Sequence, residues 1–235
     1  MSRSKRLVVY ALACAALLMV AAPATAQQTL NFTLGRTTPF GSDARADGDV
    51  LVANSQFLTV QPEDFGRAVV GGEWLVGLGP FIEAGAGISF SRRTVPTVYS
   101  GFVDAQGNEI EQQLRLRTIP TTFTLRFVPT SLRSPIQPYI GAGISVISWR
   151  YSEFGDFVDF GTPARLVRPG TFVADGTETG PVVVGGLRFA GDTMTAGAEI
   201  RYQKAEADLD DRFAGNTLDL GGWTYQFTVG VRFGR

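Results

Sequence analysis

Large apolar side chains alternate one by one with small or polar ones in the last part of the chain, where residues 223–233 read WTYQFTVGVRF. A period of two is that of a β-strand, whose successive side chains point to opposite faces. Seven other segments have strand character, so the pattern predicts an all-β protein. They are residues 29–36, 66–78, 81–94, 110–128, 137–151, 181–189 and 193–205.

The fourth of these segments changes register part-way along. Leu114 and Leu116 fit one phase of the alternation, whereas Phe123 and Leu125 fit the other. The change falls at residues 118–120, which include a proline, and a proline inside a strand is typical of a bulge or an edge. We expect one inserted residue there to restore the facing of the strand.

The connections between the predicted strands alternate in length. The long ones are residues 37–65, 95–109, 152–180 and 206–218, and the others are short turns. Antiparallel strands with every long loop at one end and every short turn at the other follow the plan of outer-membrane barrels. We therefore predict an eight-stranded antiparallel transmembrane up-and-down barrel, closed by pairing of the first strand with the last.

The beginning of the chain has the pattern of an export signal. MSRSKR carries three positive charges, a short apolar run follows, and Ala-Thr-Ala at 24–26 has the form of a cleavage site. We expect residues 1–26 to be a signal peptide and residues 27–235 to form the outer-membrane β-barrel domain. No later stretch approaches the ~18 consecutive apolar residues of a transmembrane helix.

Composition narrows the function classes. The 235 residues include 21 Lys and Arg, 22 Asp and Glu, one cysteine (Cys14) and no histidine. Nothing in this balance suggests the basic surface of a nucleic-acid-binding protein. Without histidine, the usual histidine-activated lipase, acyltransferase and protease sites cannot be built. The acids at 206–211 lack the spacing of a calcium loop, so we expect no metal site and no cofactor.

The polar faces of the strands carry small residues and a few charges of both signs. A soluble surface is much richer in charge, whereas a narrow eight-stranded interior is just wide enough to be filled by side chains. We therefore expect the polar faces to point inward and their charges to be paired. The predicted interior charges are Arg67, Glu73, Glu83, Arg93, Arg115, Arg117, Arg126, Arg188, Glu199, Arg201 and Arg232.

Aromatic residues lie near the ends of the apolar faces. Trp and Tyr at headgroup depth form the girdles of membrane barrels, so we predict that these side chains form a lipid-facing aromatic belt. They are Trp74, Phe90, Phe127, Phe189, Tyr202, Trp223, Tyr225 and Phe233.

With these features, the sequence resembles the small outer-membrane β-barrels of Gram-negative cells, the OmpA/OmpX/OmpW-like group. The strands EAGAGISFS (83–91) and YIGAGISVIS (139–148) and the alternating last strand carry the resemblance. It implies an outer-membrane location, a lipid environment and recognition by the barrel-insertion machinery. In that group the last strand usually ends on an aromatic residue, whereas here Gly234 and Arg235 follow Phe233.

The expected function is that of a non-enzymatic barrel with a structural or surface-interaction role, whose ligand the sequence does not name. Two alternatives stay open. One is a narrow channel for small or hydrophobic solutes, and the other is a secreted, lipocalin-like carrier of an apolar ligand. The direction of Trp223 and Phe227 separates the classes, because they point outward in a membrane barrel and inward in a carrier.

Overall fold

The computed structural model of this chain describes residues 27–161 and 166–234, and the predicted signal peptide lies outside them. Eight strands form one closed barrel, in the order β1-β10-β7-β6-β5-β4-β3-β2. The strands are β1 (Gln28–Pro39), β2 (Arg67–Gly77), β3 (Ile82–Val103), β4 (Glu109–Phe127), β5 (Ile136–Val158), β6 (Val167–Ala190), β7 (Met194–Gln203) and β10 (Gly222–Phe233). The predicted fold class is confirmed.

The barrel closes between its first and last strands. β1 pairs with β10 from Gln28 opposite Phe233 to Pro39 opposite Gly222, and it pairs with β2 on its other side. Every pair of neighbouring barrel strands is antiparallel. The sheet therefore has no open edge within the barrel, which is the condition for a sheet to exist in lipid.

Four of the strands are about twice as long as the others. β3, β4, β5 and β6 have 22, 19, 23 and 24 residues, against 10–12 in β1, β2, β7 and β10. The additional residues of these long strands lie beyond the last pair of β3 with β2 (Ser91 with Val69) and the last pair of β6 with β7 (Val182 with Gln203). The predicted loops 95–109 and 152–180 are therefore mostly hairpin. We call residues 92–103, 109–117, 150–158 and 167–175 the blade.

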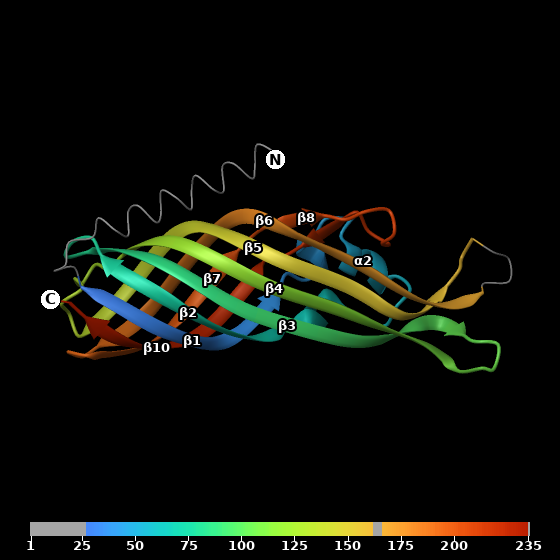
Figure 1. The fold of residues 1–235 in the computed structure, drawn as a ribbon, viewed down its shortest axis with the longest axis horizontal. Coiled ribbons are helices and arrows are strands. Elements are labelled where there is room, and N and C mark those ends of the chain that lie inside the picture. The colour runs from blue at the N-terminus through green and yellow to red at the C-terminus, as the bar shows by residue number, and fades with distance from the viewer. Residues whose placement is uncertain (1–26, 162–165, 235) are drawn as a thin grey trace.

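The blade lies at the long-loop end, which is the extracellular end in the plan of outer-membrane barrels. In Figure 1 its two hairpins run past α2 to the right-hand end of the molecule, opposite the C-terminus. The short turns and the first residues of β1 lie at the same end as the C-terminus, as expected for an even number of strands.

β4 contains no bulge at residues 118–120, so that prediction is wrong. Its register with β5 continues without a shift from Phe127 opposite Ile140 to Gln112 opposite Gly155. Even-numbered side chains of β4 point inward along the whole strand, and only the polarity of the faces changes. On the blade side of Thr118 the inner face carries Leu116, Leu114 and Ile110, because there it packs on loop residues.

Two loops fill the space beneath the blade, and we call residues 40–65 and 204–221 the cap. The first loop contains η1 (Ser42–Ala44), α2 (Val50–Ser55) and η2 (Pro62–Phe65), and the second contains the pair β8 (Glu206–Asp208) and β9 (Thr217–Asp219). The first loop also covers the free edge of β3, because Thr59 N–H donates to the Val98 carbonyl and Ser100 N–H to the Phe57 carbonyl. An edge covered in this way cannot pair with another chain.

The cap and the inner face of the blade share one hydrophobic core. Each large apolar side chain buried there contributes about 1.5–3 kcal/mol, so the core holds the cap in place. The blade and the barrel strands below it supply Val95, Tyr99, Ile110, Leu114, Leu116, Ile147, Trp149, Tyr151 and Val158, and the cap supplies Val50, Leu51, Leu58, Val60, Phe65, Ala205, Ala207, Phe213, Leu218 and Leu220. Within the described ranges, no helix is both long and apolar enough to cross a membrane.

Glycine inside the strands keeps the barrel narrow. A Cβ added to Gly143 would lie 1.8 Å from the carbonyl oxygen of Phe123, and one added to Gly141 would lie 2.6 Å from that of Leu125. The glycines of YIGAGISVIS are thus required by close backbone approach, as expected for mid-strand glycine.

Candidate functional site: a filled lumen beneath the cap

Four ionised side chains join opposite walls of the barrel. Arg126 of β4 pairs with Glu73 of β2, and with Glu199 of β7 at 2.8 Å. Arg201 of β7 pairs with the same two carboxylates, at 3.4 Å to Glu73 and 2.8 Å to Glu199. All four side chains are at least nine-tenths buried. Two positive and two negative groups form a closed, neutral set, which is the arrangement that buried charges require.

Uncharged polar side chains complete this network. The Tyr139 hydroxyl and the Gln226 amide both donate to Glu199, at 3.0 and 2.9 Å. The guanidinium of Arg126 also lies 4.8 Å from the centre of the Tyr139 ring, within the range of a cation–π contact. The network is therefore positioned by side chains from several strands around the lumen.

Two further layers lie along the lumen. Toward the short turns, Arg188 of β6 makes a two-pronged contact with Glu83 of β3, at 2.8 and 3.2 Å. Toward the cap, the buried Arg67 donates to the hydroxyls of Ser91 and Thr118 at 2.8 and 3.0 Å. No described carboxylate forms an ion pair with Arg67, so hydroxyl and carbonyl oxygens hold its charge.

Two of the predicted interior charges lie at the margins of the lumen. Arg93 is exposed, because the pairing of β2 with β3 stops at Ser91 and leaves this part of β3 without a neighbouring strand. Its Nε donates to the carbonyl of Asp64 at 3.1 Å. Arg232 is half-buried at the short-turn end. Its guanidinium donates to the carbonyls of Gly191 and Leu132 at 2.8 and 2.9 Å, so its partners there are carbonyl oxygens.

Arg115 and Arg117 face outward, and their assignment to the interior is wrong. Their neighbours Leu114 and Leu116 are the buried, inward-facing residues of this part of β4. The error follows from the predicted bulge, which would have reversed the facing. Arg115 donates to the Thr94 hydroxyl at 3.1 Å and stacks on the ring of Phe154 at 4.7 Å.

The predicted belt residues all lie on the outer face, in two groups. At the short-turn end are Trp74, Phe127, Phe189 and Phe233, and at the other end of the outer apolar face are Phe90, Tyr202, Trp223 and Tyr225. The Tyr202 and Trp223 rings are 5.0 Å apart, on adjacent strands. Phe227, midway along β10, is 73% exposed and Trp223 is 42% exposed. These outward directions are those expected of a membrane barrel and oppose the carrier alternative.

A buried carboxylate joins the two loops of the cap. Asp49 accepts the N–H of Leu51 at 2.9 Å and so caps α2. Its second oxygen lies 2.7 Å from Arg45 and also accepts the N–H of Asp219 at 2.7 Å. The Arg45 and Asp49 side chains are fully buried. Sequence reasoning missed this junction, although an Asp directly before an apolar run is a recognised helix-start signal.

Asp219, on the second loop, is itself buried, and burial raises the pKa of its carboxyl above the ordinary value. The N–H of Gly221, which donates to it at 2.7 Å, and the charge of Arg45 act in the opposite direction. Folding therefore favours the protonated form. The stability that this form contributes is present below the ordinary aspartate pKa of about 3.9 and is lost as the pH rises through the folded-state value.

We expect Asp219→Asn to flatten the pH dependence of cap opening. Asparagine keeps an oxygen that accepts from Gly221 but has no charge to bury, so the variant gains stability relative to the parent as the pH rises from the ordinary aspartate pKa through the raised folded-state pKa of Asp219. A cysteine at Ala207, in a Cys14→Ser background, reports cap opening through its rate of thiol labelling. Thiol labelling itself depends on pH, and this dependence cancels in the ratio of the two proteins' labelling rates at each pH. A ratio that is constant with pH would contradict the raised pKa of Asp219.

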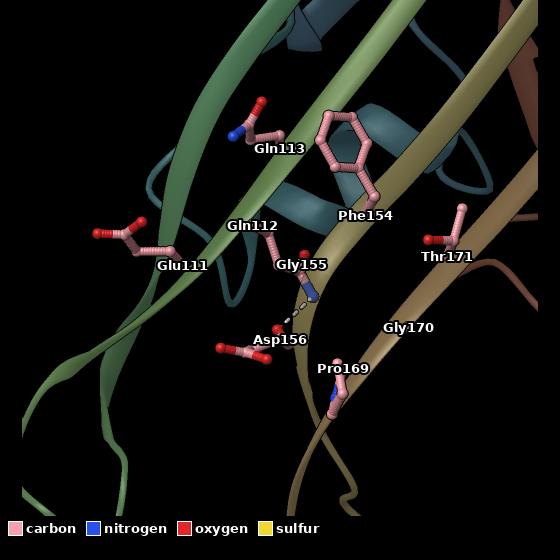
Figure 2. A pocket seen from close by; sticks show the side chains of 9 residues that line it. All are labelled: Glu111, Gln112, Gln113, Phe154, Gly155, Asp156, Pro169, Gly170 and Thr171. Atoms are coloured by element: carbon pink, nitrogen blue, oxygen red, sulfur yellow. Dashed lines mark hydrogen bonds between the residues drawn. The ribbon is translucent and has the colours of Figure 1, made fainter.

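A groove of about 530 Å³ lies on the outer face of the blade, between β4, β5 and β6. Figure 2 shows the residues that line it, among them Glu111, Gln113, Phe154, Asp156 and Thr171. The buried, inward-facing Gln112 links two of its strands, because its amide donates to the Asp156 carbonyl at 3.1 Å. Carboxylates and amides around an aromatic ring suit a polar ligand. Among the described residues, no group of three or more potential ligands is placed to hold a metal ion.

Neither a protein-family model nor a curated protein matches this sequence. Among solved structures, it is similar to the outer membrane protein OprG from Pseudomonas aeruginosa, with a TM-score of 0.52 and 11% identity, over 91% of this chain and 99% of that one. Ail, the attachment invasion locus protein of Yersinia pestis, gives a TM-score of 0.47 and 10% identity, over 88% and 99% of the two chains. The chain has the fold of the small outer-membrane barrels, as the resemblance implied.

Proposed function

We propose that this chain is a non-enzymatic outer-membrane barrel that is sealed to solutes and presents the capped blade at the cell surface. The observation that carries the proposal is the ion-pair network of Glu73, Arg126, Glu199 and Arg201, which ties opposite walls together across the lumen. The Arg188–Glu83 contact on one side and the hydrophobic core of the cap on the other add two further obstructions. An eight-stranded barrel leaves little lumen to begin with.

The route to the membrane is part of the proposal. Residues 1–26 act as a signal peptide, and the alternating last strand is the segment that the barrel-insertion machinery recognises. The outward apolar face of β10, from Trp223 to Phe233, supports contact with outer-membrane lipid.

The surface role belongs to the blade and the cap. Burial of the cap against the blade makes this region rigid, and rigid elements position binding groups well. The groove lined by Phe154, Glu111 and Asp156 is the ligand-sized hollow on its outer face. These features support a structural or surface-interaction role over the channel alternative.

Conductance separates the sealed barrel from a channel. Protein recovered from the membranes of expressing cells is inserted into planar bilayers in 1 M salt, and we expect no steady ion current. A double variant, Arg126→Ala with Arg201→Ala, removes both cations from the network and provides the comparison. Steady single-channel current from the parent protein would contradict the sealed lumen, and recovery of the protein as a detergent-free soluble species would contradict membrane residence.

A further inference from the structure

Three outward-facing arginines lie side by side across three strands. Arg92 of β3 is directly opposite Arg117 of β4, and Arg117 is directly opposite Arg150 of β5. All three belong to the outer face of the sheet, since their chain neighbours Ser91, Leu116 and Trp149 are buried. We call Arg92, Arg117 and Arg150 the arginine row. Directly opposite residues on neighbouring strands have Cβ atoms about 4.5–5.5 Å apart, so like charges there repel.

The row has more positive charge than the described residues around it offset. None of the three arginines forms an ion pair or donates a hydrogen bond to a described residue. The exposed Asp175 is opposite Arg150 at the far end and is the only acid in register with them. Arg115, two residues beyond Arg117, adds a fourth positive charge. The lumen arginines Arg126, Arg188 and Arg201, in contrast, each have a carboxylate partner.

The row lies at the depth of the outer lipid headgroups. Arg92 and Arg117 are each ten residues from the outward apolar side chain at the short-turn end of their strands, Ile82 or Phe127. Arg150 is likewise ten residues from Ile140, which is directly opposite Phe127. Ten residues span about 33 Å along a strand and, at a tilt of about 40°, about 25 Å across the membrane, which is the height of the apolar band.

Aromatic residues on the other side of the barrel indicate the same depth for the outer headgroup layer. Trp223 lies ten residues from Phe233 on β10 and, with Tyr202 and Tyr225, forms the aromatic end of the outer apolar face there. On β3 and β4, the side chains just below the row are Phe90 and Ile119, so the outer face changes there from apolar to cationic within two residues, whereas on β5 Ser148 lies between Arg150 and the apolar Val146. Aromatic residues therefore mark this interface on β7 and β10, and arginines mark it on β3–β5.

We propose that the arginine row binds the phosphate groups of a phosphorylated lipid in the outer leaflet. Guanidinium groups bind phosphate oxygens in pairs, and the lipid chains of such a ligand would cover the apolar face around Phe90 and Ile119. An anion between the arginines would also relieve their repulsion. The inference rests on the proposed membrane location, and it gives the barrel a preferred lipid on one side.

The test compares binding of diphosphorylated lipid A with binding of its dephosphorylated form. Protein recovered from cell membranes is held in neutral maltoside micelles, where a heat-modifiable gel mobility first verifies that the barrel is folded. Lipid is then titrated in and quantified on the protein by native mass spectrometry. The variant is Arg92→Gln/Arg117→Gln/Arg150→Gln. The matched control is Arg133→Gln/Arg168→Gln/Arg212→Gln, which removes the same charge from exposed positions elsewhere.

We expect the parent and control proteins to bind the phosphorylated lipid much more tightly than the dephosphorylated one. Loss of about fivefold per arginine predicts roughly a hundredfold weaker binding by the row variant. A triple lysine variant keeps the charge and is expected to stay within about tenfold of the parent, since lysine also binds phosphate but as a point charge.

Three results would overturn the proposal. They are equal affinity in the row variant and the control, equal affinity for the two lipids, and displacement of the lipid by millimolar inorganic phosphate, which would make the row a site for the free ion. Failure of the parent chain to fold in micelles or to enter vesicles would instead refute the membrane location itself, so the two failures are distinguishable.

Discussion

Replacing Arg126 with leucine is expected to lower the free energy of unfolding by ~3–5 kcal/mol, because it breaks a buried ion pair and leaves an uncompensated charge. The carboxylates of Glu73 and Glu199 would then share Arg201 alone. Urea unfolding of the protein in lipid vesicles, followed by the gel mobility of the folded barrel, measures the change.

Two further variants serve as controls for Arg126→Leu. Arg133→Leu removes an exposed arginine in a short turn and is expected to change stability by no more than ~0.5 kcal/mol. Arg126→Leu combined with Glu199→Gln restores neutrality and leaves Glu73 with Arg201, so the double variant should cost less than the sum of the single ones. Strict additivity, or an unchanged urea midpoint in Arg126→Leu, would show that the network does not hold the lumen together.

The barrel could be predicted from the sequence because its determinants are local. A period of two is visible in the residues themselves, as in β10 from Trp223 to Phe233, and loop length alone separates the two ends of the barrel. Strand limits were less accurate. β6 begins at Val167, whereas the sequence pattern places its start near residue 181. The first half of β6 escapes prediction because it pairs only with β5 and lacks the apolar outer face that lipid demands.

In the blade, the sequence alone does not predict which face of each strand points inward. Alternation reveals that a strand has two different faces but not which face is inside. In β4, Phe123 points to the lipid side and Leu116 points to the cap core, and both are simply apolar residues in alternating patterns. The change of environment near Pro120 therefore has the same signature as a bulge. This is why the sequence pattern places Arg117 in the interior although it belongs to the arginine row.

Contacts between segments that are distant in the chain could not be predicted from the sequence either. The junction of Arg45, Asp49 and Asp219 brings together two loops that are about 170 positions apart in the chain. Charged residues in polar loops are common, and nothing in their spacing distinguishes these three from exposed neighbours such as Asp43 and Asp47.

Asp49→Ala is expected to release the cap while the barrel stays closed. The substitution leaves Arg45 buried without its partner, at a cost of ~3–5 kcal/mol, and removes the N-cap of α2, worth ~1 kcal/mol. At about 1.4 kcal/mol per tenfold, amide exchange in α2 should accelerate by about three to four orders of magnitude, up to the limit set by the stability of the cap. The N–H groups of Ala53 and Leu58, which donate within this loop, report the change by hydrogen exchange.

Asp47→Ala is the matched control, since it removes an exposed aspartate two residues away and should leave exchange in α2 unchanged. The barrel strands provide the internal reference. The cap is attached to the barrel by side-chain packing and a few hydrogen bonds, whereas β1 and β10 are joined by a continuous ladder. Their amides should therefore keep their protection in Asp49→Ala. Equal acceleration in β1 and α2 would instead mean that the cap and the barrel unfold as one unit, with the cap serving as part of the core that closes the barrel.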